Sequence, residues 1–339
     1  MNAQILQATA RALVAPNKGI LAADESFPTI AKRFQSIGID STEANRRDYR
    51  NMLFTTPNAN EFISGVILFD ETLRQSNAEG TPLVDILNAA GIIPGIKVDS
   101  GAKSMAGTKG EKITEGLDGL RDRLVEYASL GARFAKWRAV ITIGNRIPSV
   151  GCIEANAEAL ARYAALCQEA NIVPIVEPEV LMDGDHDIDR CEAVTTQALD
   201  AVFSALKRHN VLLEGILLKP NMVISGKDCP QRAGINEVAE RTVRCLKRTV
   251  PAAVPGIVFL SGGQTAEEAT AHLSAMNKGP LPWELSFSYG RALQDPALRA
   301  WAGKSDHVSR AQDVFYHRSQ CNGAARTGKY TAEMEQRIA

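Results

Sequence analysis

The amino-acid sequence predicts an α/β protein with a (β/α)₈ TIM-barrel fold, and three observations carry this prediction. Eight short runs rich in β-branched and apolar residues are spread along the 339-residue chain. Segments with helical periodicity separate these runs, and such alternation is typical of parallel strands joined by crossover helices. No linker or change of composition interrupts the repeat, so we expect residues 1–339 to form a single domain built as a closed barrel, not an open doubly wound sheet.

The predicted strands are apolar over nearly their full length, as expected for a sheet that is covered on both faces. They are Gly19–Asp24, Ile63–Asp70, Gly91–Asp99, Phe134–Ile141, Ile172–Val180, Leu213–Pro220, Gly256–Leu260 and Leu285–Tyr289. The helical segments include Thr114–Leu130, Ile153–Glu169, Asp189–His209, Ile235–Arg248 and Ala266–Asn277. Residues 1–18 and 300–339 lie outside the repeat, where we expect an N-terminal flanking helix and a C-terminal helix with a short tail.

The composition excludes several classes of protein. The chain has 38 Lys and Arg residues against 39 Asp and Glu residues, without the clustered positive charge that binding to nucleic acid or an anionic membrane surface needs. No stretch approaches the roughly 18 to 20 consecutive apolar residues of a membrane-spanning helix. The six cysteines occur singly, and the first residues do not resemble a signal peptide. We therefore expect a cytoplasmic protein that binds neither nucleic acid nor membranes.

Ionisable side chains stand at or just after the ends of most predicted strands, where the active site of a (β/α)₈ barrel lies. A single charge of this kind is often only a solvated residue at the rim of a strand. The lysines, however, stand within apolar runs such as Leu217–Pro220, where an unpaired charge costs on the order of several kcal/mol. We therefore expect a buried cluster of paired lysines and carboxylates, drawn from Asp24, Lys97, Asp99, Lys136, Arg138, Glu177, Glu179, Lys219 and Arg291.

A cluster of interior lysines indicates Schiff-base chemistry. A lysine with an ordinary pKa near 10.4 is almost fully protonated at pH 7. Burial and neighbouring cations both lower this pKa, and a value near about 7 makes a neutral, nucleophilic amine available. We expect the three interior lysines to act on one another in this way.

Two glycine-containing loops indicate a phosphate site. Ser261–Gly263 follows the seventh predicted strand, and Tyr289–Arg291 follows the eighth. The loops at these places in (β/α)₈ barrels commonly bind phosphate through backbone N–H groups, and an arginine adds a bidentate contact. The alternative interpretation is a tight turn without a ligand.

The sequence does not favour a metal or a nucleotide cofactor. The loop Asp183–Asp187 contains three aspartates and a histidine, but the other four histidines are scattered without paired-ligand spacing. Gly303–Ser305 resembles the end of a nucleotide-binding loop, but Leu298 stands where that motif needs its first glycine. No glycine-rich dinucleotide fingerprint follows the first strand. We expect no metal and no cofactor.

Longer motifs occur in order from about residue 8 to about residue 331. They are Gly19–Ser26, Ile30–Arg33, Gly65–Phe69, Phe134–Arg138, Val176–Glu179, Leu217–Met222, Phe259–Gly263 and Phe287–Arg291. In these motifs the chain strongly resembles the class I fructose-1,6-bisphosphate aldolase family. The resemblance implies a (β/α)₈ barrel that cleaves fructose 1,6-bisphosphate reversibly into dihydroxyacetone phosphate and glyceraldehyde 3-phosphate. It also implies a lysine Schiff base, no metal ion and usually a homotetramer.

The resemblance also implies roles for individual residues. Lys219 matches the lysine that forms the Schiff base. Glu177 matches the acid and base that removes water from the carbinolamine, and Glu179 stands beside it. Asp24 matches the base that takes the proton of the C4 hydroxyl. Lys136 and Arg138 match the family's Lys-Trp-Arg motif, in which Lys136 orients substrate and tunes Lys219. The phosphate-binding positions are Ser26, Lys32, Arg33, Lys97, Ser261, Gly262, Gly290 and Arg291.

Three departures from better-known animal members leave alternatives open. Phe27, Pro28 and Thr29 replace smaller or hydroxylated residues and could reshape a phosphate contact, and Asp70 replaces a histidine. No tyrosine ends the sequence, so we expect Glu177 to protonate the enamine in place of a terminal tyrosine. An aldolase that prefers fructose 1-phosphate or sedoheptulose 1,7-bisphosphate, and a non-catalytic scaffold that kept the barrel, are the two rival interpretations.

Overall fold

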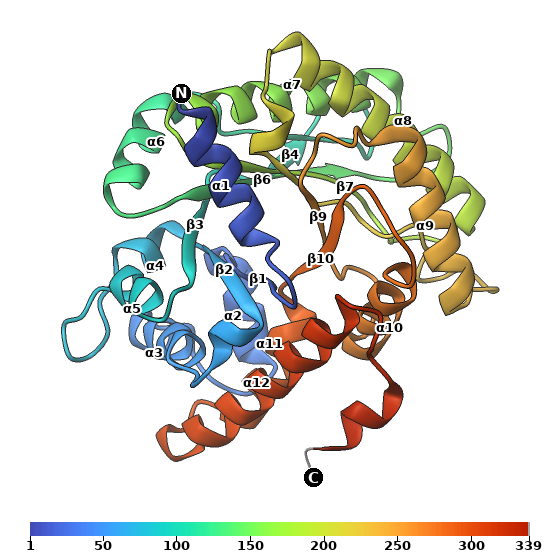
Figure 1. Ribbon diagram of the computed structural model, residues 1–339. Coiled ribbons are helices and arrows are strands. Elements are labelled where there is room, and N and C mark those ends of the chain that lie inside the picture. Colours follow the sequence, from blue (N-terminus) through green and yellow to red (C-terminus); the bar gives the residue numbers. More distant parts are fainter. Residues whose placement is uncertain (338–339) are drawn as a thin grey trace.

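The computed structural model describes residues 1–337, and it contains a closed barrel of eight parallel strands with helices around it (Figure 1). The order around the barrel is β1, β10, β9, β8, β7, β6, β3 and β2. Each of the eight predicted strand runs overlaps one of these strands, so the predicted fold class is confirmed. The strands are β1 (Gly19–Ala23), β2 (Ile63–Leu68), β3 (Ile93–Lys97), β6 (Phe134–Ile141), β7 (Val173–Val180), β8 (Leu217–Leu218), β9 (Gly256–Phe259) and β10 (Glu284–Tyr289).

Most of the helices connect successive strands and cover the outside of the barrel. They are α1 (Ala3–Leu13), α2 (Phe27–Gln35), α3 (Glu43–Phe54), α4 (Asp70–Arg74), α5 (Leu83–Ala89), α6 (Leu120–Ser129), α7 (Val150–Glu169), α8 (Ile188–Arg208), α9 (Ile235–Thr249), α10 (Ala266–Met276), α11 (Arg291–Trp301) and α12 (Val308–Ala325). Short 3₁₀ helices are η1 (Ala59–Glu61), η2 (Leu213–Gly215), η3 (Ser305–His307) and η4 (Ala332–Arg337). No helix within residues 1–337 is both long and apolar enough to cross a membrane. That the whole chain is a single domain stays a prediction.

The alternation of side chains along each strand places the charged residues inside the barrel. On β6, Phe134 belongs to the apolar cluster that joins α1 to the barrel strands. Lys136 and Arg138 follow at steps of two and therefore face the same way. The same steps lead to Asp24 after β1, to Glu177 and Glu179 on β7, and to Lys219 after β8, each preceded by a residue of that cluster.

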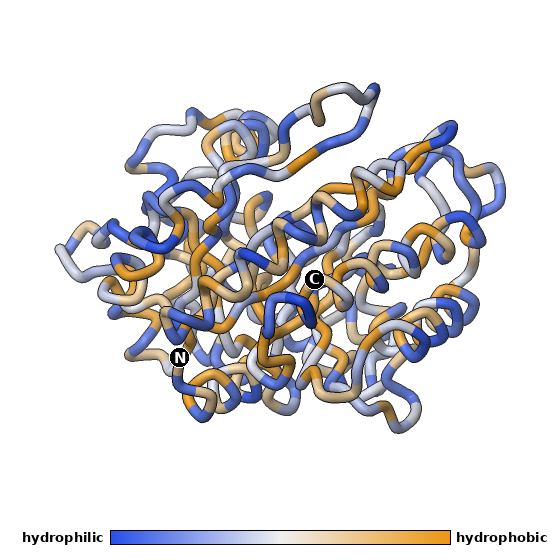
Figure 2. Tube along the Cα trace, turned by 90° about the horizontal axis from the view of Figure 1, so that it is seen from above, coloured by the Kyte–Doolittle hydropathy of each residue, from blue (hydrophilic) through white to orange (hydrophobic). Residues whose placement is uncertain are grey.

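Helix α1 closes the end of the barrel at which the strands begin, and it lies across the ring of strands in Figure 1. Leu6, Ala10 and Leu13 of this helix are fully buried against the first residues of the strands. Gly65 on β2 makes this approach possible, because a Cβ atom there would lie 2.7 Å from the side chain of Leu13. Figure 2 shows hydrophobic residues concentrated toward the interior and hydrophilic ones along many outer loops. One end of the barrel is thus apolar and sealed, and the polar end is left for chemistry.

Two predicted elements are wrong in part. The predicted helix Thr114–Leu130 begins only at Leu120, since Thr114 ends a short hairpin of β4 (Ala102–Ser104) and β5 (Lys112–Thr114). Gly116 and Gly119 between them have φ of +126° and +65°, which interrupts a right-handed helix. The predicted strand Leu213–Pro220 begins with the 3₁₀ helix η2, and only Leu217 and Leu218 pair as a strand.

The predicted flanking helices are present. Helix α1 lies within residues 1–18, and the predicted C-terminal region contains α12 followed by η4. The last two residues of the predicted tail, 338–339, lie outside the described residues.

Candidate active site

A cavity of about 800 Å³ lies at the carboxyl ends of the barrel strands. All but one of the predicted site residues line it, although they come from segments far apart in the sequence. The exception is Lys32, which lines a neighbouring cavity of about 560 Å³ between α2 and α11. The predicted residues in the main cavity are Asp24, Ser26, Arg33, Lys97, Lys136, Arg138, Glu177, Glu179, Lys219, Ser261, Gly262, Gly290 and Arg291.

Four charged side chains form a continuous chain of contacts at the bottom of this cavity. Lys136 Nζ lies 2.6 Å from Asp24 Oδ2 and 3.4 Å from Glu177 Oε2. The other oxygen of Glu177, Oε1, lies 3.3 Å from Lys219 Nζ. Lys136 and Lys219 are only 4% exposed. Two carboxylates balance two ammonium groups, which is the pairing that buried charges require.

The cluster changes the protonation of its members. Burial alone would raise the pKa of Asp24, but the ammonium groups of Lys136 and Lys219 hold it well below its usual range. Burial alone would lower the pKa of Lys136, but Asp24 and Glu177 raise it well above its usual value. For Lys136 the expectation of a lowered pKa was therefore wrong, because two carboxylates outweigh burial and the neighbouring lysine.

A second set of ion pairs lies nearer the mouth of the cavity. Arg138 Nε donates to Glu179 Oε2, and the backbone N–H of Arg138 donates to Asp99 Oδ2 over 3.2 Å. Lys97 Nζ donates to the backbone oxygen of Asp99 over 2.6 Å and lies 2.7 Å from its Oδ1. The Arg138 side chain is 43% exposed and that of Glu179 only 9%, so the guanidinium faces the open part of the cavity.

The rim of the cavity is suited to bind anions. The N-terminal ends of α2 and α11 both border it, and neither helix has an acidic residue in its first turn. Ser26 precedes α2, and its hydroxyl lies 3.2 Å from the hydroxyl of Thr29. The Ser26 side chain does not cap the backbone N–H groups of α2. Free N–H groups and hydroxyls at a helix N-terminus are typical partners of phosphate.

The loop after β9 approaches the ion pairs closely. A Cβ atom at Gly262 would lie 3.2 Å from Glu179 Oε1, so a larger residue would press on that carboxylate. Gly263 has φ +76°, and a Cβ there would lie 2.6 Å from Met182. Gly262 therefore lets the backbone reach the cavity, and binding of phosphate by this loop stays a prediction.

Sequence reasoning missed a buried network behind the cavity. Glu25 accepts a hydrogen bond of 2.5 Å from Arg50 and one of 2.8 Å from Gln294, and it lies 2.6 Å from Arg33. Tyr49 donates to Gln294. This network joins α2, α3 and α11 directly below the rim. The only signal in the sequence was a second carboxylate next to Asp24.

Two further lining residues were also missed. Ser288 on β10 has a buried hydroxyl with no hydrogen-bond partner among residues 1–337, and it stands two residues before Gly290. Its position on the inward-facing row of β10 could have identified it. Lys103 lies on the β4–β5 hairpin, and the sequence pattern predicted no hairpin in this part of the chain.

Of the residues that depart from the animal pattern, Pro28 and Thr29 line the cavity, and Phe27 and Asp70 do not. Phe27 packs edge-to-face on Phe69 with ring centroids 5.1 Å apart, and Arg46 lies over its ring. Pro28 is at the start of α2, where a proline is readily accommodated. Asp70 begins α4 and pairs with Arg74, outside the cavity.

A (β/α)₈ barrel with a buried lysine–carboxylate cluster in a cavity at its strand ends is the arrangement expected of a lyase that forms Schiff bases with phosphorylated carbonyl compounds. The family model described as fructose-bisphosphate aldolase class-I matches residues 5–339. The chain therefore belongs to the class I fructose-bisphosphate aldolase family.

Individual relatives agree with this assignment. A probable fructose-bisphosphate aldolase class 1 of Xanthomonas axonopodis pv. citri is 60% identical over 332 residues, covering 97% of this chain and 99% of the relative. The cytosolic fructose-bisphosphate aldolase 4 of Arabidopsis thaliana is 55% identical, covering 97% and 84% of the two chains. The Plasmodium falciparum aldolase, solved in complex with TRAP and a small-molecule inhibitor, superposes with a TM-score of 0.96. It is 50% identical, with 98% and 97% of the two chains covered.

The activity follows from this membership. The protein is a fructose-bisphosphate aldolase, a carbon–carbon lyase of glycolysis and gluconeogenesis. It cleaves fructose 1,6-bisphosphate reversibly into dihydroxyacetone phosphate and glyceraldehyde 3-phosphate through a lysine Schiff base, without a metal ion.

Proposed function

We propose that Lys219 is the lysine that forms the Schiff base and that Asp24, Lys136 and Glu177 perform or support its proton transfers. The unbroken chain of contacts from Asp24 through Lys136 and Glu177 to Lys219 carries this proposal. Lys219 follows β8 directly, so its amine is held at the carboxyl end of the barrel interior. A side chain at the end of a rigid strand is held in a fixed position relative to the bound substrate.

In the first half of the reaction, Lys219 passes a proton to Glu177, whose Oε1 lies 3.3 Å from the amine nitrogen, and the resulting neutral amine attacks the C2 carbonyl of the substrate. A proton moves from this nitrogen to the carbonyl oxygen, which becomes a hydroxyl. The protonated Glu177 then donates its proton to that hydroxyl, so that water leaves and an iminium forms. Glu177 suits this role, because its Oε2 makes no hydrogen bond among the described residues beyond the 3.4 Å contact with Lys136. The iminium is an electron sink for the bond that breaks next.

In the second half, Asp24 removes the proton of the C4 hydroxyl. The C3–C4 bond breaks, its electrons form an enamine with the iminium, and glyceraldehyde 3-phosphate leaves. Glu177 regains a proton from solvent after the loss of water, and we assign to it the protonation at C3. Addition of water then releases dihydroxyacetone phosphate and free Lys219. The neighbours of Asp24 keep it ionised, so its carboxylate is in the form that can accept a proton.

Lys136 acts in this scheme as a permanently charged positioning group. Its raised pKa keeps it an ammonium ion that fixes both Asp24 and Glu177. Arg138 and Glu179 form a pair above the cluster, where we propose that they orient the substrate hydroxyls.

We propose that the two phosphates of the substrate occupy the two ends of the cavity mouth. The contacts would come from backbone N–H groups and hydroxyls near the two helix N-termini and from cations at the rim. Lys32 would contribute from the neighbouring cavity, which shares Arg33 and Arg291 with the main one. Binding of groups remote from the reacting carbons positions C3 and C4 for cleavage. The proposed phosphate ligands are Ser26, Lys32, Arg33, Lys97, Ser261, Gly262, Gly290 and Arg291.

The rival substrates can be separated in one assay. We expect kcat/KM to be higher for fructose 1,6-bisphosphate than for fructose 1-phosphate or sedoheptulose 1,7-bisphosphate, and to be unchanged after dialysis against a strong chelator. A higher value for another sugar phosphate would change the substrate preference. Loss of activity restored by zinc would contradict Schiff-base catalysis.

Arg291 provides a test of the anion-binding rim. Arg291→Ala should weaken binding of fructose 1,6-bisphosphate by about 1.5 to 3 kcal/mol, roughly 10- to 150-fold, because a charge-assisted contact is lost. Binding of the uncharged ketose fructose should change little. The matched control is Arg299→Ala, since Arg299 lines only the neighbouring cavity. Equal losses for both ligands would assign Arg291 a structural role.

We propose further that the protein is a cytoplasmic homotetramer. The names of cytosolic relatives support the location. The family resemblance supports the tetramer, and an apolar groove of about 730 Å³ between α9 and α10 offers a surface that a second copy could cover. Sedimentation equilibrium tests the assembly, and a monomer at micromolar concentration would contradict it.

A further inference from the structure

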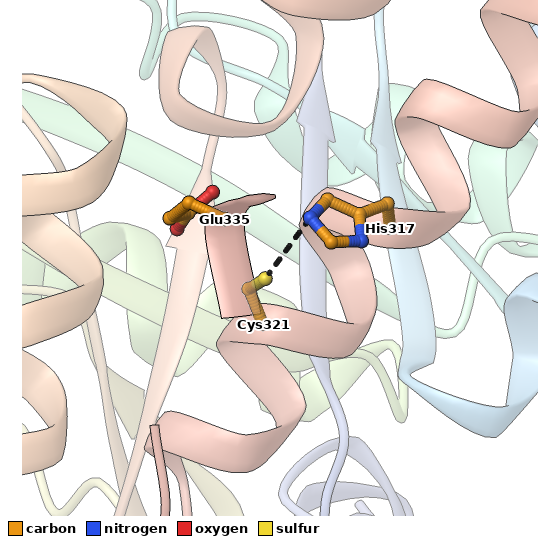
Figure 3. A group of neighbouring side chains, drawn as sticks. All are labelled: His317, Cys321 and Glu335. Atoms are coloured by element: carbon orange, nitrogen blue, oxygen red, sulfur yellow. Dashed lines mark hydrogen bonds between the residues drawn. The ribbon is translucent and has the colours of Figure 1, made fainter. Parts of the chain in front are cut away.

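A cluster of metal-binding side chains lies outside the active site, where α12 meets η4. His317 and Cys321 are four residues apart on α12 and thus share one face of the helix. Glu335 on η4 lies beside them. Figure 3 shows the thiol of Cys321 directed at the ring of His317, with Glu335 on the other side of the thiol. None of the three lines the active-site cavity.

The geometry of the cluster fits a small divalent ion. Cys321 Sγ lies 3.6 Å from His317 Nε2, and one donor atom from each of the three residues lies within 4.8 Å of the others. In a tetrahedral zinc site, bonds of about 2.0 Å to nitrogen and about 2.3 Å to sulfur place these two donors about 3.5 Å apart. Only Glu335 would need to move closer.

The chemistry of the donors favours zinc. Thiolate, imidazole and carboxylate groups are all ligands that Zn²⁺ takes, and calcium or magnesium prefer oxygen donors. A thiolate and a carboxylate also neutralise the double charge of the ion. Arg318 and Tyr330 both donate to Oε1 of Glu335, so we assign Oε2 as the atom that binds zinc.

The three described ligands differ in their exposure. Cys321 is fully buried, and His317 is 8% exposed. The Glu335 side chain is 22% exposed, so the site opens to solvent on that side. Water would complete a tetrahedral site there.

We propose that His317, Cys321 and Glu335 bind one Zn²⁺ ion, which joins η4 to the C-terminal half of α12. The site is separate from the aldolase reaction, which proceeds without a metal. Zinc binding should stabilise the native protein, because an ion that binds only the folded state shifts the unfolding equilibrium.

Cobalt provides a direct probe of the thiolate ligand. Metal-free protein titrated with Co²⁺ should develop a thiolate-to-cobalt charge-transfer band and the visible bands of a four-coordinate ion, saturating at one equivalent. Added Zn²⁺ should remove these bands. Cys321→Ala should abolish the charge-transfer band. His317→Gln and Glu335→Gln should each weaken Zn²⁺ binding by more than about 100-fold, beyond the loss seen when only an outer-shell partner is removed.

A matched control separates this site from other thiols. Cys229 is only partly buried, contacts the backbone oxygen of Gln231 and does not belong to the cluster. Cys229→Ala should therefore leave the cobalt spectrum unchanged. Melting temperature with and without Zn²⁺ gives a second readout, and circular dichroism and aldolase activity check that each variant is folded. Persistence of the band in Cys321→Ala, or equal Zn²⁺ affinity in Glu335→Gln, would overturn the proposal.

Discussion

Lys219→Ala is expected to lower the rate of fructose 1,6-bisphosphate cleavage by about 10⁴-fold or more while leaving the fold intact. The substitution removes the amine that we propose forms the covalent intermediate, and loss of a nucleophile is among the largest single effects in an enzyme. It also leaves Glu177 with one ammonium neighbour, Lys136, in place of two. Circular dichroism and steady-state kinetics at pH 7.5 measure the two effects.

Chemical trapping tests the same assignment without a substitution. Borohydride added with dihydroxyacetone phosphate should reduce the Schiff base and leave a stable adduct on Lys219, which peptide mass mapping locates. The matched control is Lys227→Ala, which removes an exposed lysine paired with Asp183 and should change neither activity nor labelling. An adduct on another lysine, or no adduct, would show that Lys219 has been assigned wrongly.

The position of the charged residues could be predicted because two simple rules act together. Apolar runs between helical segments locate the strands, and the step of two along a strand places Lys136 with Arg138, and Glu177 with Glu179, on one face. A (β/α)₈ barrel then brings the ends of all strands to one mouth. The residues at the strand ends therefore meet in one cavity despite their distance in the sequence.

The partners within that cavity could not be predicted in the same way. Which carboxylate contacts which lysine depends on the stagger of neighbouring strands, and the contact of Asp24 with Lys136 reversed the expected direction of the Lys136 pKa. The contacts of Glu25 with Arg50 and Gln294 depend on how α3 and α11 pack, for which the local sequence contains no signal.

Helical geometry explains why one predicted phosphate ligand lies elsewhere. Lys32 and Arg33 are adjacent in the sequence, but successive residues of an α-helix point about 100° apart. Arg33 therefore lines the active-site cavity, whereas Lys32 lines only the neighbouring ones. The motif predicted both residues as phosphate ligands because it contains no information on the orientation of α2.

Asp24→Asn is expected to lower kcat by about 10² to 10⁴-fold, because an amide of nearly the same shape cannot accept the C4 hydroxyl proton. Since Schiff-base formation does not use this carboxylate, borohydride trapping with dihydroxyacetone phosphate should persist in the variant. Asp70→Asn is the matched control, because Asp70 lies outside the cavity and pairs with Arg74. If Asp24→Asn lost trapping and cleavage together, Asp24 would be needed for the cluster itself and not for the cleavage step.

The pH dependence gives an independent test of how Asp24 is kept ionised. In the native protein the pKa of Asp24 lies below its usual range, so the carboxylate persists as the pH falls through 5 and 4. Lys136→Met removes the ammonium group that contributes most to this lowering, and burial would then raise the pKa of Asp24. The acid limb of the profile of kcat/KM against pH should therefore move to higher pH in Lys136→Met. The residual activity of the double variant, Lys136→Met with Asp24→Asn, should show no such limb. An acid limb at the same pH in the native enzyme and in Lys136→Met would assign it to another group.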